Sequence, residues 1–89
     1  QGTILQGANL QEADLRGANL AGADMRSAYF QNAYLRHAHL QGANLANAIL
    51  ERAFLEYVNL QGAVLAVADL QGAYLKEADA VLFHSSTVN

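Results

Sequence analysis

The chain contains few residues whose types and spacing could support chemistry. His37 and His39 form a His-x-His sequence that could bind a metal ion, but two imidazoles without a nearby carboxylate or cysteine make a weak site. His84, Ser85 and Ser86 lie near the C-terminus and suggest no Ser-His-Asp order. The glycines stand singly rather than in a phosphate-binding loop. The sequence therefore predicts no catalytic, cofactor-binding or metal-binding residues, no cofactor and no enzymatic activity.

A five-residue period determines the elements that must position any functional side chain. Of the sixteen pentads centred from Leu5 to Ala80, thirteen have leucine at the centre and fourteen have alanine two residues earlier. In a helix, which turns about 100° per residue, leucines five apart would share no face. In a straight strand, successive leucines would alternate between opposite faces. The pattern is satisfied if each pentad is a short extended piece followed by a corner, with Ala and Leu pointing inward.

Corners of about 90° would close one coil every four pentads. Glycine recurs at this spacing of twenty residues, at Gly2, Gly22, Gly42 and Gly62. This ladder predicts a corner whose conformation or closeness a Cβ would hinder. We therefore expect an all-β, four-sided parallel solenoid of about four coils over residues 1–82, followed by a C-terminal cap or tail at residues 83–89.

Individual pentads also carry a family signature. Runs such as Ala8-Asn9-Leu10 and Ala13-Asp14-Leu15 resemble the A-[D/N]-L-x-x repeat of pentapeptide-repeat proteins. The resemblance extends from Thr3 to about Leu82, although the Asn/Asp position holds another residue in half of the copies. It implies a right-handed quadrilateral parallel β-helix with inward Leu and Ala. The family is abundant in bacteria, cyanobacteria especially, and many members have no assigned biochemical role.

Composition limits the class of protein further. The 89 residues carry a net charge of −3 and are enough for one small domain. No apolar run approaches the roughly twenty residues of a membrane span. Cysteine is absent, which excludes disulfides and thiolate chemistry. No signal-peptide pattern is seen, which favours the cytoplasm, and the missing initial Met indicates a processed piece or fragment of a longer chain.

Outward residues twenty apart should become neighbours, because stacked strands lie about 4.8 Å apart. The position before each centre then forms a column of Asp14, Tyr34, Phe54 and Tyr74 on one face. The rings could simply stack and stabilise the solenoid, or bind a protein, since aromatics and arginine are enriched at interfaces. Beside this column runs a second one, made of Arg16, Arg36, Glu56 and Lys76. The predicted protein-binding residues, of which Tyr29 belongs to the adjoining face, are Tyr29, Tyr34, Arg36, Phe54, Tyr57 and Tyr74.

The expected function is that of a rigid structural or protein–protein interaction module with an unidentified protein partner. Nucleic acid is not an expected partner, because the chain has only five Lys and Arg residues. Some pentapeptide-repeat proteins are DNA mimics that inhibit DNA gyrase, and the resemblance offers this as the alternative function. A mimic about 20 Å long would need on the order of ten negative charges on one surface. This chain has eight acidic residues in all, with bases among them.

The two ends of the solenoid are also candidate interaction sites. The repeat pattern is lost after Ala80, where Leu82 and Phe83 either cap the last coil or form a self-association surface. Repeats begin at once at the N-terminus, so we expect missing residues, a neighbouring domain or another copy to cover that end. The sequence therefore leaves end-to-end or C-terminal self-association open.

Overall fold

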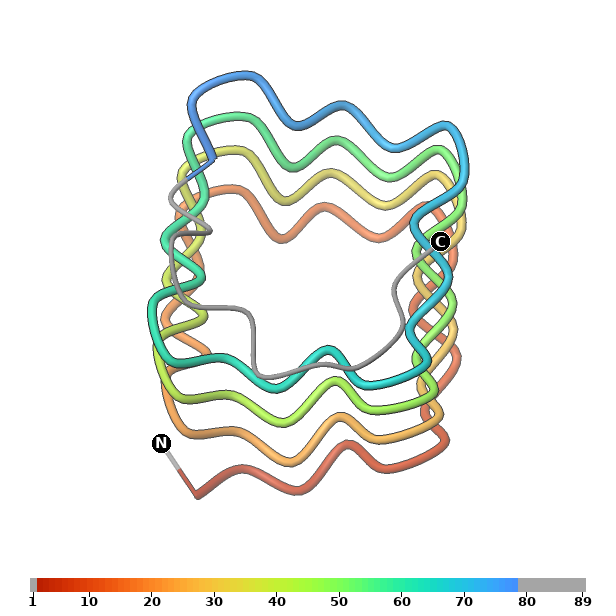
Figure 1. Ribbon diagram of the computed structural model, residues 1–89, viewed down its shortest axis with the longest axis vertical. Helices are drawn as coiled ribbons and strands as arrows, with labels where there is room; N and C mark the ends of the chain where they lie inside the picture. The colour runs from red at the N-terminus through yellow and green to blue at the C-terminus, as the bar shows by residue number, and fades with distance from the viewer. Residues whose placement is uncertain (1, 79–89) are drawn as a thin grey trace.

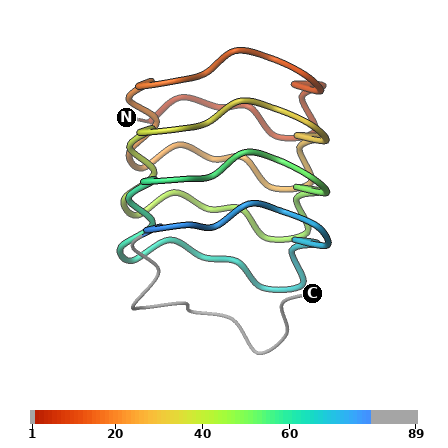
Figure 2. The same cartoon turned by 90° about the horizontal axis from the view of Figure 1, so that it is seen from above.

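The computed structural model describes residues 2–78, which wind round four sides (Figure 1) and stack as parallel coils (Figure 2). Isolated parallel bridges join residues twenty apart, from Ile4–Asp24 to Phe54–Tyr74. In the described part of the chain, each side contributes such bridge residues rather than a helix or a long strand. The twenty-residue closure predicted from the sequence is therefore confirmed for these residues.

Hydrogen bonds between successive coils hold the sides in register. The Tyr34 amide donates to the Ala13 carbonyl of the coil before it at 2.9 Å, and the Leu35 amide donates to the Phe54 carbonyl of the coil after it at 2.8 Å. The same alternation repeats along each side. Most backbone amides are thus needed in the ladder, which suits a sequence without proline.

The corners are tight four-residue turns with a positive φ at their third residue. At the first of them the Ala8 amide donates to the Leu5 carbonyl at 2.9 Å, and Gly7 has φ 70°. Nine corner residues with positive φ are not glycine. A Cβ on Gly42 would meet no atom within 4 Å. The expectation that the glycine ladder marks one special corner is therefore wrong, because every corner between residues 2 and 78 uses the same left-handed conformation.

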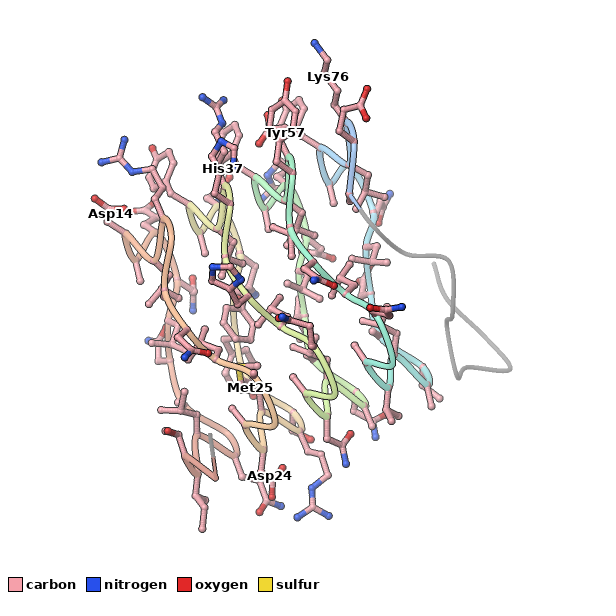
Figure 3. All side chains as sticks on the ribbon, turned by 90° about the vertical axis from the view of Figure 1, so that its left-hand side faces the viewer. Asp14, Asp24, Met25, His37, Tyr57 and Lys76 are labelled. Atoms are coloured by element: carbon pink, nitrogen blue, oxygen red, sulfur yellow. The ribbon has the colours of Figure 1, made fainter. Side chains whose placement is uncertain are left out.

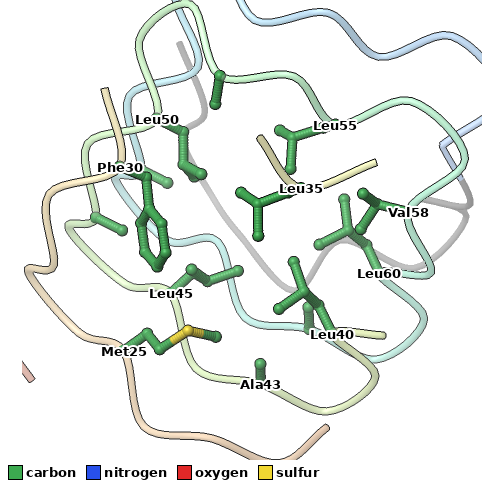
Figure 4. Packing of buried hydrophobic residues seen from close by; sticks show 14 of the residues in the cluster. Met25, Phe30, Leu35, Leu40, Ala43, Leu45, Leu50, Leu55, Val58 and Leu60 are labelled. Carbon is green, nitrogen blue, oxygen red and sulfur yellow. The ribbon is translucent and has the colours of Figure 1, made fainter. Parts of the chain in front are cut away.

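The interior of the described coils is purely apolar. Each interior coil places alanine and leucine inward, with Met25, Phe30 and Val58 as the variations (Figure 4). No polar or charged residue is buried among residues 2–78. Towards the ends the shielding weakens, since Leu5 is only partly buried and Leu75 is 39% exposed. The predicted inward positions are confirmed, and the interior offers no polar group for chemistry.

Some predictions concern residues outside this region. Leu82 and Phe83, and the division between residues 82 and 83, lie beyond the described residues. Within residues 2–78, no helix has the length and apolar character needed to cross a membrane.

Candidate protein-binding face

Three aromatic rings form a continuous stack on one face of the solenoid. The centroids of Tyr34 and Phe54 lie 5.0 Å apart and those of Phe54 and Tyr74 lie 4.8 Å apart, with interplanar angles of 3° and 5°. The parallel bridges between these residues set this spacing. Tyr34 and Tyr74 remain 45% and 50% exposed, so stacking still leaves ring surface available to a partner. We call Tyr34, Phe54 and Tyr74 the aromatic column.

A second stack lies at the corner that follows the aromatic column. The rings of His37 and Tyr57 lie 4.9 Å apart and 9° from parallel. Both residues have positive φ, 64° and 61°, which directs their side chains out from the corner. In Figure 3 both rings lie on the same edge of the solenoid as Asp14 and Lys76, and Asp24 lies on the opposite edge. The structure thus brings Tyr57 beside the predicted face.

Sequence reasoning missed His37 as a member of this surface. It considered His37 together with His39 as a His-x-His metal pair, but His39 lies on the next side, in a column with Asn19 and Asn59. Among the described residues, no group of three or more His, Cys, Asp or Glu side chains could hold a metal ion. The twenty-residue spacing between His37 and Tyr57 was the signal that could have found the stack.

Tyr29 does not join the other aromatic residues. It bridges to Asn9 and Ile49 on the adjoining side and is 41% exposed there. Tyr29 therefore lies on the adjoining side, as its position in the sequence predicted, and not in the aromatic column.

In the first coil, this face carries a bidentate ion pair between Arg16 and Asp14. Arg16 donates from Nε and Nη2 to the Asp14 carboxylate at 2.8 and 2.7 Å. These bonds, together with one from the Arg16 backbone amide, lower the pKa of Asp14 to about 2. The same arrangement recurs on the opposite edge, where Arg26 holds Asp24 at the same distances.

The ion pair between Arg36 and Glu56, in the coils that follow, is looser. Arg36 Nη2 lies 3.5 Å from Glu56 Oε2, and the side chain of Arg36 is 53% exposed. Glu56 Oε1 is buried without a hydrogen-bond partner. Arg16, Arg36, Tyr34 and Phe54 line a surface hollow of about 220 Å³. The face therefore combines exposed rings, a loosely paired arginine and a surface hollow.

A mixed charge pattern also occurs on the adjoining side. Asp69 raises the pKa of Glu51, first through hydrogen bonding between the two carboxyl groups and then through its negative charge. Arg52 lies close by and opposes this shift. Neither side therefore presents a coherent anionic surface.

Comparison with known proteins identifies the family. The family model described as "Pentapeptide repeats" matches residues 1–32 and 28–66, with eight copies. The chain belongs to the pentapeptide repeat family. Its members are right-handed quadrilateral β-helices, and the four-sided coil in Figure 1 is this fold.

Solved pentapeptide repeat structures resemble the chain over most of its length. A pentapeptide repeat protein from Nostoc Pcc 7120 has 36% identity and a TM-score of 0.83, with 84% of this chain and 62% of that chain covered. A protein from the Arabidopsis thaliana thylakoid lumen has 29% identity and a TM-score of 0.60, with 86% and 57% covered.

A third structure, Rfr23 from the cyanobacterium Cyanothece 51142, shares the fold at 24% identity and a TM-score of 0.54, with 88% and 84% covered. No curated protein matches the chain. The chain spans less than two thirds of the length of the first two structures, at 62% and 57%.

Proposed function

We propose that this protein is a non-enzymatic, right-handed solenoid of about four coils that binds another protein through one face. The aromatic column forms the centre of this face, and Arg36 and Tyr57 lie beside it. The observation that carries the proposal is the pair of exposed ring stacks at 4.8–5.0 Å spacing on adjoining positions of one side. We call the whole surface the aromatic face.

Rigidity makes such a surface suitable for recognition. Association costs free energy for each flexible side chain that is immobilised, on the order of 0.5–1.5 kcal/mol. Tyr34 and Phe54 are already held by parallel stacking and by the backbone ladder. Aromatic and arginine side chains are also the types that contribute most to binding energy at protein interfaces. The aromatic face therefore offers contact area at a small ordering cost.

The charge pattern does not favour DNA mimicry. On the aromatic face, the carboxylates of Asp14 and Glu56 face the guanidinium groups of Arg16 and Arg36 at 2.7 and 3.5 Å. A duplex presents one negative charge per about 1.7 Å, with no interspersed cations on its backbone. A partner that binds this surface must therefore recognise aromatic rings and arginine rather than a continuous row of negative charges.

A pull-down from lysate of the source organism, with mass spectrometry, tests the proposal. The variant Tyr34→Ser/Phe54→Ser/Tyr74→Ser removes the aromatic column, and circular dichroism must show that it is folded. Tyr29→Ser/Ile49→Ser is the matched control, because it removes apolar side chains in neighbouring coils on the adjoining side. The proposal predicts a partner that the control retains and the triple variant loses. Identical partners for all three proteins would contradict it.

A further inference from the structure

The hollow beside the aromatic column has a specific chemical character. Its lining includes both Tyr34 and Phe54, which are stacked within 3° of parallel. Phe54 is stacked on both sides, by Tyr34 and by Tyr74, so it meets the hollow with its ring edge. Ring edges carry the positive end of the aromatic quadrupole. This part of the wall therefore favours a negatively charged group over a cation.

The remaining lining residues are two arginines that are paired with carboxylates to different extents. Arg16 and Arg36 border the hollow, whereas the carboxylates of Asp14 and Glu56 do not line it. The Arg36–Glu56 contact of 3.5 Å is much looser than the 2.7 Å contact of Arg16 with Asp14. Charged hydrogen bonds are short, about 2.7–2.9 Å, when well formed. An incoming carboxylate can therefore compete with Glu56 for the guanidinium group of Arg36.

Size and net charge restrict the anion further. At about 220 Å³ the hollow is smaller than the roughly 300–1,000 Å³ of pockets for drug-sized ligands. A chain with net charge −3 also repels polyanions such as nucleic acid. One carboxylate on an otherwise uncharged segment suits both the volume and the charge.

We infer that the hollow receives a single Glu or Asp side chain of the partner protein, with Arg36 as its principal ion-pair donor. The inference rests on the proposed function, since it names the group by which the aromatic face would recognise its partner. Arg16 also lines the hollow, but its charge is largely compensated because both Asp14 oxygens bind it.

Side-chain NMR with defined peptides tests this inference directly. The probes are a blocked pentapeptide with one Glu between Leu and Phe, its Gln counterpart, inorganic phosphate and a single-stranded oligonucleotide. The Glu peptide should shift the Arg36 Nε and Tyr34 ring signals saturably, and the Gln peptide should not. Equal shifts from the two peptides, equal shifts at Arg26, or tighter binding of phosphate or oligonucleotide would overturn the inference.

Three single variants should change the affinity for the Glu peptide in three different ways. Arg36→Gln should weaken Glu-peptide binding about tenfold, the factor expected when one charged hydrogen bond is lost. Glu56→Gln should strengthen binding, because it removes the carboxylate that competes for Arg36. Arg26→Gln breaks an ion pair with the same geometry as that of Arg16 on the opposite edge, and it should change nothing. A change in the same direction for Arg36→Gln and Glu56→Gln would overturn the inference.

The same variants separate this inference from the proposed function. Loss of a lysate partner from the triple aromatic variant, with full retention by Arg36→Gln, would overturn the carboxylate site and leave the aromatic face as a binding surface. Retention of all partners by the triple variant would instead contradict the proposed function, whatever the peptide result.

Discussion

Asp14 illustrates how a local sequence pattern sets the properties of a single residue. Arg16 follows it by two positions, so the backbone amide of Arg16 at 3.3 Å and the guanidinium both bind the Asp14 carboxylate. These bonds lower its pKa from 3.8 to about 2. Because the pKa of Asp14 is lower in the folded state, its ion pair contributes its full stability above pH 3.8 and loses it as the pH falls through about 2.

An NMR titration of the Asp14 carboxyl carbon checks this shift. The midpoint should lie near 2 in the wild type and return towards 3.8 in Arg16→Gln. Asp24 provides an internal control in both proteins, because Arg26 lowers its pKa in the same way and is unchanged by the substitution. The same Asp14 midpoint with and without the Arg16 side chain would show that the ion pair does not form in solution.

Val67 is a second residue whose environment makes a testable prediction. It is β-branched and 56% exposed, and its φ is 59°. The left-handed conformation costs most residues about 1–2 kcal/mol, whereas Asn adopts it readily. Val67→Asn should therefore raise the free energy of unfolding by about 1 kcal/mol in a urea titration. Asn47, one coil earlier on the same corner with φ 62°, offers the reverse test, because Asn47→Val should lower stability by a similar amount. No change in either variant would contradict the strain argument.

At the scale of the element, each side of a coil accommodates one large and one small inward residue. Ala33 and Leu35 are both 0% exposed, and the Ala33 carbonyl accepts a hydrogen bond from Phe54 at 2.9 Å. Ala33→Leu overfills this space and Leu35→Asp buries an unpaired carboxylate, so both should abolish folding. Gln31→Ala should change stability by less than about 0.5 kcal/mol, because the packing lost with this half-buried side chain is offset by removal of its buried, unpaired Oε1. Thermal melting measures all three, and an unchanged melting temperature for Ala33→Leu would refute this packing.

The inward side chains and the positions of the corners were predictable from the sequence, and the corner conformation was not. Leu, Ala and the five-residue step determine which residues face inward, because neither a helix nor a straight strand would place residues at this spacing on one face. The corner conformation depends on a positive φ and on hydrogen bonds between coils, and the residues found at the corners are too varied to reveal either. Tyr57 shows this, since its amide donates to the Lys76 carbonyl at 3.0 Å while its φ is 61°. A reader of the sequence therefore assigns glycine too much importance at such corners.

At the scale of the whole molecule, the stacking of coils converts sequence spacing into surface neighbours. The twenty-residue spacing predicted the aromatic column. The same spacing, applied to the corner residues, would also have predicted that His37 stacks on Tyr57. The looseness of the Arg36–Glu56 contact and the hollow beside Phe54 were beyond prediction, because they depend on side-chain rotamers. The position of the candidate site was therefore predictable from the sequence, whereas its ion pairing and its hollow were visible only in the structure.

Photo-crosslinking shows whether a protein binds at the aromatic face. Benzoylphenylalanine would replace Tyr74 in one purified protein and Tyr29 in another, both about half exposed but on different sides of the solenoid. If the aromatic face binds a protein, irradiation in lysate of the source organism should give one dominant crosslinked protein from position 74 and none of it from position 29. The same crosslinked proteins, in the same amounts, from both positions would show that the aromatic face is not the binding surface.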